Sequence, residues 1–507
     1  MKMFPNKVSL TRYAIVLSIF TTLAFHIPFF KHLFAQLEGG ANAVLITVGA
    51  FLLLAGLNFL LYWILVWAGR FGGRCIVSFT LIGDAITLYF INDYEVLVTD
   101  EMMGNVFNTQ MSEAGGFFSI GFVLYVLLLG VLPSVYVFAR KVDYGSWKRF
   151  LAGIGAALGV VAAAAFGNIK NWPWIDRNAT ELGSLLMPWS YIVNSFRYWD
   201  AEKQRNRKEI LLPDGVWADD DPAVCVLVIG ESARSDHFSY FGYPRETNPF
   251  TKADSLRAFP AISSATFTIA GVKAILEPVE SAELYEILPN YLYRSGADVS
   301  WRTSNWGEPP CHFPRYYHIE DLQKRDPEAD PSFDGILLAG LGEDILSSTA
   351  AKQLVVIHTN TNHGPSYNNK YPAEFEHFTP VCNTVEMAKT SQQELFNAYD
   401  NSIVYTDYLL HSVIETLRSF PGRSCMIYVS DHGESLGENN LYMHGVPYSM
   451  APREQLEIPF LVWTSDSSYK VKDLPQASQH HVFHSVIYFL GLGSDAFDEN
   501  KNIFEKQ

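Results

Sequence analysis

The first third of the chain is a succession of long apolar stretches separated by short polar loops. The five stretches cover residues 13–30, 43–67, 75–91, 117–138 and 150–166. Most of them approach the roughly 20 apolar residues that a helix needs to cross the hydrocarbon core of a bilayer. The first could serve as a signal peptide, but four more stretches follow it and no small-residue cleavage site is evident. The pattern predicts a membrane domain of five spanning helices over residues 1–167.

The basic residues of the loops predict the orientation of these helices. They lie before the first stretch (Lys2, Lys7, Arg12), between the second and third (Arg70, Arg74), and between the fourth and fifth (Arg140, Lys141, Lys148, Arg149). The other loops are poor in Lys and Arg, and residues 93–113 are acidic. The positive-inside rule places the N-terminus in the cytoplasm. Five spans then place everything after Gly167 outside the cytoplasm.

The pattern changes in the second half of the chain. From residue 222 to 507, short apolar runs alternate with longer helical stretches such as 392–417. This alternation is typical of a soluble α/β domain with a mostly parallel central sheet and helices on both faces. Residues 168–221 connect the two parts and are rich in Trp, Tyr and Phe. Aromatic residues favour the membrane–water interface, so we expect an amphipathic bridging segment there.

Three of the apolar runs end in residue types that bind metals. The residues that follow them are Glu231 after 225–229, His358 and His363 after 354–357, and Asp431 and His432 after 426–429. Ligands in α/β sheets tend to bind just beyond the carboxyl ends of the strands. Carboxylate and imidazole groups are ligands that zinc accepts. Asp-His-Gly alone is equally typical of a capped loop, but the convergence of three strands favours a metal site.

Four stretches of the chain resemble the phosphoethanolamine transferases of the lipid A-modifying type, a family that includes the mobilised colistin-resistance (polymyxin-resistance) enzymes. They are IGESARSDHFSYFGYPRETNP (229–249), HTNTNHGPSYNNKYP (358–372), YDNSIVYTDY (399–408) and SDHGESLGENNLYMHGVPYSMAPREQLEIPF (430–460). The resemblance extends over nearly the whole chain. It implies an alkaline phosphatase/sulfatase-like fold for residues 222–507, a bacterial inner-membrane location and a periplasmic catalytic domain.

The resemblance also implies the reaction and its partners. Phosphatidylethanolamine would donate phosphoethanolamine to a threonine, and an envelope glycolipid or glycan would accept it. Lipid A is the first expectation; Kdo, core heptose and periplasmic glucan stay open as acceptors. A monomer is expected. The net charge of −16 and the lack of a basic stripe disfavour nucleic acid as a partner.

The family pattern assigns the central residues. Thr268, in the run Thr266-Phe267-Thr268, matches the attacking threonine, and Thr266 is the alternative. Ser232 is a further candidate by its position directly after Glu231. The implied metal site consists of Glu231, Thr268, Asp431 and His432, with Zn²⁺ as the expected ion and Mn²⁺ as the alternative.

Further residues match positions around this centre. His363 and His444 match two family histidines that bind substrate, protonate a leaving group or bind a second metal. Glu434 would support a ligand or bind that second metal, and Asn305 matches a substrate-binding loop. That loop otherwise departs from the family, with Glu308-Pro309-Pro310 where relatives carry Gly and Lys. Head-group binding is implied for a polar stripe at helical spacing: Asn105, Thr109 and Glu113.

Several features leave alternatives open. Asp84, inside the third apolar stretch, is either a functional intramembrane acid or one that faces a polar bundle interior. The five cysteines show no disulfide framework, unlike those of relatives, and only Cys311 and Cys382 form a conceivable pair. The run His480, His481 and His484 is interpreted as the start of a surface helix.

Other functions are compatible with the same fold. A phosphoglycerol transferase and a metal-dependent phosphodiesterase or sulfatase-like hydrolase would both fit the strand-end ligands. A sulfatase would need a Cys or Ser formylglycine motif, and none lies in the nucleophile region. A non-enzymatic membrane sensor is the non-catalytic alternative, and the full set of ligands argues against it.

Overall fold

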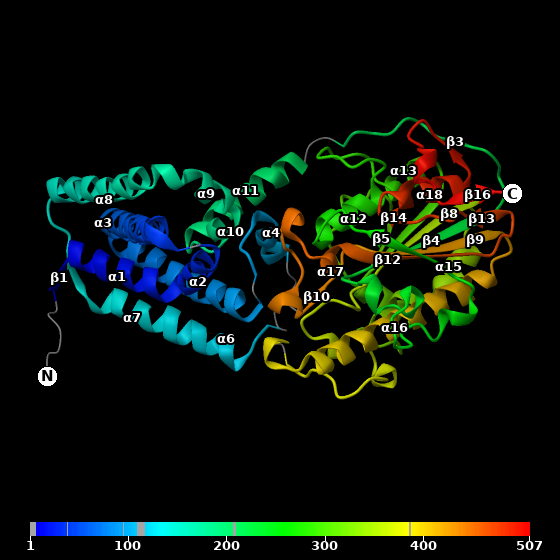
Figure 1. Cartoon of the computed structure of the whole chain (residues 1–507). Coiled ribbons are helices and arrows are strands. Elements are labelled where there is room, and N and C mark those ends of the chain that lie inside the picture. The colour runs from blue at the N-terminus through cyan, green and yellow to red at the C-terminus, as the bar shows by residue number, and fades with distance from the viewer. Residues whose placement is uncertain (1–6, 38, 95, 109–116, 206–208, 385–386) are drawn as a thin grey trace. The chain divides into compact units, whose positions relative to one another are not determined.

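The structure is a computed structural model that describes residues 7–37, 39–94, 96–108, 117–205, 209–384 and 387–507. It divides into two compact units, Met1–Tyr198 and Trp199–Gln507 (Figure 1). The first unit is helical and apolar, and the second is built around one large sheet.

The first unit contains the apolar helices that the hydrophobic pattern predicts. They are α1 (Leu10–Phe25), α2 (Ile27–Gln36), α3 (Gly40–Tyr94), α6 (Ile120–Tyr125), a π-helical turn (Val126–Val131), α7 (Leu132–Ala139) and α8 (Trp147–Gly167). Among the described residues, three continuous helical segments are long and apolar enough to cross a membrane, namely 40–94, 120–139 and 147–167, and the bent pair α1 and α2 makes a fourth candidate. Within the stretch 13–30, predicted as the first span, the chain bends by 58° between Phe25 and Ile27, so α1 and α2 form either a broken span or a re-entrant loop. Pro28 lies in the first turn of α2, where a proline starts a helix but cannot continue one.

Helix α3 is far too long to be one membrane span. Its 55 residues would extend about 80 Å as a straight helix, against about 30 Å of hydrocarbon. The backbone of Arg70 is not helical (φ 49°, ψ −112°). A Cβ on Gly73 would lie 1.8 Å from the carbonyl oxygen of Leu65, which shows that the chain turns back on itself here. Thus α3 provides two legs on either side of the predicted loop, and the total of five membrane crossings stays a prediction.

The three basic loops of the first unit lie together. Strand β1 (Lys7–Ser9) pairs in parallel with β2 (Lys141–Asp143). The guanidinium of Arg70 lies 3.8 Å from the ring centre of Tyr144, and Arg74 Nη2 donates a hydrogen bond to the Tyr144 hydroxyl at 3.2 Å. The loops that the charge pattern places on one side of the membrane are therefore at one end of the bundle.

Shorter helices complete the first unit. They are α4 (Asp100–Asn108), α9 (Trp172–Arg177), α10 (Ala179–Ser184) and α11 (Trp189–Arg205), the last of which continues into the second unit. Asp84 is fully buried in the bundle, and its Oδ1 accepts a hydrogen bond from the Tyr191 hydroxyl of α11 at 3.0 Å. This intramembrane acid thus faces a polar partner inside the bundle.

The second unit is organised by an eight-stranded sheet of order β14-β5-β12-β9-β4-β8-β6-β7. Its strands are β4 (Ala223–Gly230), β5 (Arg257–Ile262), β6 (Asp298–Thr303), β7 (Arg315–His318), β8 (Lys352–His358), β9 (Arg423–Ser430), β12 (Glu457–Thr464) and β14 (Ala477–Ser478). Strands β9, β4, β8, β6 and β7 are parallel, whereas β12 runs antiparallel to both β9 and β5. The central strands β4 and β8 are buried along their whole length, which explains their continuous apolar runs.

Helices cover both faces of this sheet (Figure 1). Helices α12 (Thr268–Leu276), α13 (Leu288–Arg294) and α18 (His481–Leu490) share the main core with the side chains of Cys225, Leu227 and Ile229. The other face is covered by α16 (Gln392–Arg418) and α15 (Leu341–Ser347). Helix α16 begins with a capping box formed by Ser391 and Glu394, as expected for a helix that starts abruptly after a loop.

Smaller elements lie around the sheet. They are α14 (Ile319–Arg325), α17 (Arg453–Leu456), β3 (Val216–Trp217), β10 (Ser435–Leu436), β11 (Tyr442–Met443), β13 (Tyr469–Val471), β15 (Leu492–Gly493) and β16 (Phe504–Lys506).

Candidate metal centre

Two neighbouring strands bring the predicted metal ligands together. Gly230 at the end of β4 pairs with Ser430 at the end of β9, and the Asp431 amide donates a hydrogen bond to the Gly230 carbonyl at 2.9 Å. The next residues along each strand are Glu231 on one side and Asp431 and His432 on the other, and none of the three is exposed. One ligand atom from each lies within 4.8 Å of the others.

Two of the atoms that face one another in this centre lack hydrogen-bond partners among the described residues. Asp431 Oδ2 and His432 Nε2 are buried and unpaired, and they lie 3.4 Å apart. His432 Nε2 is also 3.4 Å from Glu231 Oε1. His432 Nδ1 donates to the Gly433 carbonyl at 2.9 Å, which leaves the Nε2 lone pair free. Buried polar atoms are normally paired, so this convergence fits a bound cation.

The electrostatics of the centre agree with its geometry. Burial, and then the nearby Glu231 carboxylate, raise the pKa of Asp431 well above its usual range. Burial lowers the pKa of His432 to about 4, so its imidazole is neutral, which is the form that binds a metal. Two buried carboxylates side by side are costly unless a positive charge lies between them. A divalent cation held by Glu231, Asp431 and His432 would supply that charge.

The structure brings one of the two candidate threonines to this centre. Thr268 is the first residue of α12, and its Oγ1 donates to Glu231 Oε2 at 3.4 Å. The hydroxyl of Thr266 instead donates to the Val446 carbonyl at 2.7 Å. Ser232 also reaches the centre, since its Oγ donates to Glu231 Oε1 at 2.7 Å.

Asn305 contacts a predicted ligand directly. It follows β6, and its Nδ2 donates to Glu231 Oε2 at 2.7 Å and to the Thr359 carbonyl at 2.9 Å. In the structure, Asn305 therefore fixes the carboxylate of Glu231; its predicted contact with substrate stays a prediction.

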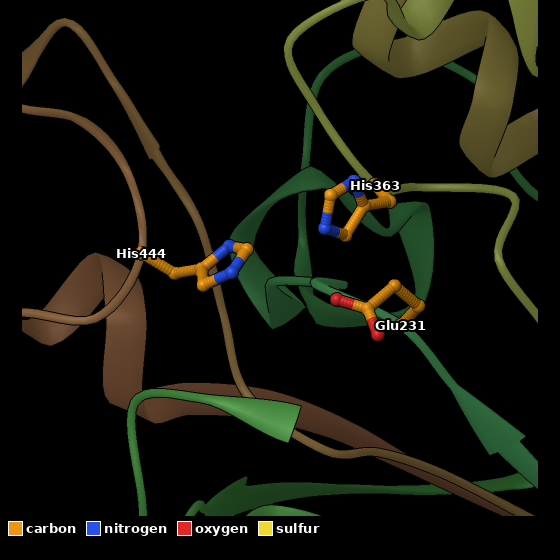
Figure 2. Close-up of side chains that lie close together, drawn as sticks. All are labelled: Glu231, His363 and His444. Atoms are coloured by element: carbon orange, nitrogen blue, oxygen red, sulfur yellow. The ribbon is translucent and has the colours of Figure 1, made fainter. Parts of the chain in front are cut away.

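A second group of side chains lies beside the first. Figure 2 shows His363, His444 and Glu231 turned toward a shared space, and one ligand atom from each lies within 4.8 Å of the others. The rings of His444 and His363 are 5.4 Å apart between centres, and those of His444 and His432 are 4.2 Å apart. His444 Nδ1 lies 2.9 Å from Glu434 Oε2, so Glu434 orients this imidazole.

Comparisons with known proteins decide the family. The Sulfatase family model matches residues 223–492, and the model for Phosphoethanolamine transferase EptA/EptB matches residues 47–202. Phosphoethanolamine transferase EptA of Helicobacter pylori is 33% identical over 495 residues, which cover 96% of this chain and 94% of the relative. The chain belongs to the phosphoethanolamine transferase family. It is thus an enzyme with the predicted sulfatase-like catalytic fold.

Two further relatives of this transferase extend the comparison. Phosphatidylethanolamine transferase Mcr-1 of Escherichia coli is 31% identical over 427 residues, covering 78% of this chain and 79% of the relative. The solved structure of the integral membrane protein lipooligosaccharide phosphoethanolamine transferase A (EptA) from Neisseria meningitidis matches with a TM-score of 0.88 at 26% identity. That match covers 98% of this chain and 99% of the other, so both units of the transferase share the fold.

One contributor to the transferase site was missed by sequence reasoning. The Tyr367 hydroxyl donates to Glu434 Oε1 at 2.8 Å and thereby supports the carboxylate that orients His444. Tyr367 lies four residues after His363 in a motif that matches the family. Its position in that motif was the only signal, since a tyrosine there is equally typical of the core.

The remaining predicted residues of the transferase form three sets. Asn105 lies in α4 of the first unit, half-buried, and Thr109 and Glu113 lie outside the described residues.

His480, His481 and His484 do begin a helix, but the prediction of a surface position is wrong. His480 and His484 are buried, and His484 uses both ring nitrogens, toward the Pro278 carbonyl and the Asp498 amide. All five cysteines are free thiols, Cys311 and Cys382 included.

Proposed function

We propose that this transferase moves phosphoethanolamine from phosphatidylethanolamine to lipid A through a covalent intermediate on Thr268 at a zinc site. The observation that carries the proposal is the position of Thr268. Its hydroxyl faces Glu231 Oε2 at 3.4 Å, beside the unpaired atoms of Asp431 and His432. A threonine hydroxyl is a weak nucleophile at neutral pH and needs such a neighbourhood to lose its proton.

Glu231, Asp431 and His432 would hold the metal, with Thr268 as the fourth ligand. One nitrogen and three oxygens suit tetrahedral Zn²⁺, and Mn²⁺ is the alternative. When bound, the ion lowers the pKa of the threonine hydroxyl and neutralises negative charge on the phosphoryl oxygens. His363, Glu434 and His444 would bind substrate oxygens or a second ion.

The first half of the reaction follows from the contacts of Thr268. Its Oγ attacks the phosphorus of the donor, an Oγ–P bond forms, and the P–O bond to diacylglycerol breaks. The threonine proton passes to Glu231, whose Oε2 it already faces. The leaving alkoxide takes a proton from His444, whose imidazole is oriented by Glu434 through Nδ1.

The second half reverses these proton movements. An oxygen of the acceptor attacks the phosphorus and gives its proton to His444, which now acts as the base. The Oγ–P bond breaks, and Thr268 recovers its proton from Glu231. The carboxylate of Glu434 favours the charged imidazolium that His444 carries before the first half and regains in the second.

The activities named for the relatives support the donor and the acceptor. Mcr-1 is a phosphatidylethanolamine transferase, and the Neisseria protein is a lipooligosaccharide phosphoethanolamine transferase. The grouping of the basic loops at one end of the bundle supports a cytoplasmic N-terminus, five spans and a periplasmic catalytic unit in the inner membrane. We place Asn105, Thr109 and Glu113 at the ethanolamine head group, with residues 168–221 as the bridge.

Mass spectrometry tests the proposal. The full-length protein, loaded with zinc and incubated with phosphatidylethanolamine, should carry one phosphoethanolamine group that fragmentation maps to Thr268. Thr268→Ala should lose the adduct, whereas Thr266→Ala should keep it. An adduct that survives in Thr268→Ala would overturn the assignment. Mass spectra of envelope glycolipids from cells with and without the gene would identify the acceptor. If lipid A carries no phosphoethanolamine in the cells with the gene, the acceptor is another glycan.

A further inference from the structure

Ser232 occupies a backbone conformation that serine rarely adopts. It lies between the metal ligand Glu231 and the turn that follows β4, with a φ of 52° and no exposed surface. Left-handed backbone at a residue other than glycine is costly, and it persists only where surrounding contacts impose it. The strained residue is therefore held by its neighbours.

Every polar atom of Ser232 makes a contact that imposes this conformation. Its amide donates to Asp431 Oδ1 at 3.0 Å, and its carbonyl accepts from the Tyr399 hydroxyl at 2.7 Å. Its hydroxyl donates to Glu231 Oε1 at 2.7 Å. One residue thus touches both carboxylate ligands of the metal centre, one through its backbone and one through its side chain.

The same hydroxyl lies next to the proton-transfer histidine. Ser232 Oγ is 3.4 Å from His444 Nδ1, which is closer to Glu434 Oε2. Because the single hydroxyl hydrogen is given to Glu231, only the oxygen lone pairs face His444. Ser232 therefore lies between the metal centre and the histidine.

The carboxylate of Glu231 is consequently held at both oxygens. Oε2 accepts from Asn305 and from Thr268, and Oε1 accepts from Ser232. The two hydroxyls lie at opposite oxygens of one carboxylate. The proposed nucleophile Thr268 contacts Oε2, and the position of Oε1 is fixed by its hydrogen bond from Ser232.

We propose that Ser232 is a positioning residue. Its hydroxyl fixes the Glu231 carboxylate for metal binding and holds this carboxylate in a constant position relative to His444. This proposal rests on the proposed function, from which it takes the reaction. The expected effect of Ser232 on metal binding does not depend on which substrate the enzyme uses. Groups that orient metal ligands typically change metal affinity or activity by about 10- to 100-fold when removed.

Two variants separate the hydroxyl from the backbone strain. Ser232→Ala and Ser232→Gly both lack the hydroxyl, but only glycine adopts the left-handed conformation without cost. Ser424→Ala is the matched control. Ser424 is also fully buried, and its Oγ pairs with Ser465 Oγ at 2.9 Å, but it lies at the opposite end of β9.

The experiment measures the zinc dissociation constant of each full-length protein by chelator competition, together with adduct formation at saturating zinc. We expect both Ser232 variants to bind zinc about 10- to 100-fold more weakly than the wild type. Ser424→Ala should bind it normally. At saturating zinc the adduct should still form on Thr268 in both variants, more slowly.

Three outcomes would overturn the proposal. Wild-type zinc affinity in both variants would show that the hydroxyl does not fix the Glu231 carboxylate for metal binding. Wild-type affinity in Ser232→Gly with weak binding in Ser232→Ala would assign the effect to backbone strain. An adduct on Ser232 in the wild type would make it the nucleophile. Failure of the proposed function looks different, because the wild type would then bind zinc and form no adduct. Should Ser232→Ala not fold, Ser232→Gly carries the same zinc measurement.

Discussion

Replacing Gly271 with alanine should slow phosphoethanolamine transfer about a hundredfold while leaving every proposed ligand in place. Gly271 lies in the first turn of α12, three residues after Thr268. A Cβ built there would be 2.3 Å from the carbonyl oxygen of Asp431 and 2.8 Å from its carbonyl carbon. These are backbone atoms, which cannot rotate away as a side chain would. The helix that begins with Thr268 therefore packs directly on the backbone of Asp431.

The size of the effect follows from the overlap. Non-bonded heavy atoms rest about 3.5 Å apart, so the contact is short by about 1 Å and α12 must move away from Asp431 by a similar amount. Thr268 lies on the same turn and moves with it. A misplacement of about 1 Å costs on the order of a hundredfold in rate, or about 2.7 kcal/mol of transition-state stabilisation. Helix propensity acts in the opposite direction, since alanine stabilises a helix by about 1 kcal/mol relative to glycine.

The assay compares initial rates of adduct formation and zinc content in the full-length protein. Gly342→Ala in α15 is the matched control, because a Cβ there would meet Thr416 Cγ2 at 3.5 Å, an ordinary contact. We expect the control to keep full activity and to unfold at the same or a slightly higher temperature. Equal rates in the two variants would refute the argument that α12 sets the position of Thr268. Loss of zinc in Gly271→Ala would show that Asp431 moved instead of the helix.

Three further predictions concern the ligands and the membrane unit. Glu434→Gln should slow transfer about 10- to 100-fold, because His444 loses the carboxylate that orients it; initial rates at unchanged zinc content test this, and a wild-type rate would exclude the role. Chelation of zinc should lower the unfolding temperature of the wild type but not of Asp431→Ala, since a ligand stabilises only a state that binds it; equal shifts in the two proteins would contradict the site. Tyr191→Phe should destabilise the detergent-solubilised protein by about 1–3 kcal/mol, because the buried Asp84 carboxyl loses its donor, and an unchanged unfolding temperature would show that water replaces the hydroxyl.

The strands that carry the ligands were predictable from the sequence, for a physical reason. A parallel strand covered on both faces must be apolar at every position, so its run is continuous and its end is marked by the first charged residue. The predicted runs 225–229, 354–357 and 426–429 all lie inside observed strands. Their adjacency explains why three separate motifs form one site.

Features that depend on distant contacts could not be predicted in this way. The left-handed backbone of Ser232 depends on Asp431, which is 199 residues away in the chain. The support that Tyr367 gives to Glu434 spans 67 residues. The burial of His484 depends on the Pro278 carbonyl. Hydropathy and motif spacing contain no information about such pairings, so these residues were either overlooked or placed on the surface.

The N-terminus of α12 bears on how the charge of the intermediate is neutralised. Phe267 caps this helix without a side-chain hydrogen bond, and neither Ile269 nor Ala270 is a proline, so the first amide groups of the helix remain available. A phosphoryl group on Thr268 would be attached at this end, where the helix dipole favours negative charge. The loop after β6 carries Glu308, whose carboxylate accepts a hydrogen bond from the Tyr316 hydroxyl, so this loop adds no positive charge. The helix end, the proposed metal and the two histidines must then neutralise the phosphoryl charge, so His363→Ala should slow adduct formation on Thr268 at unchanged zinc content, and a wild-type initial rate would contradict this account.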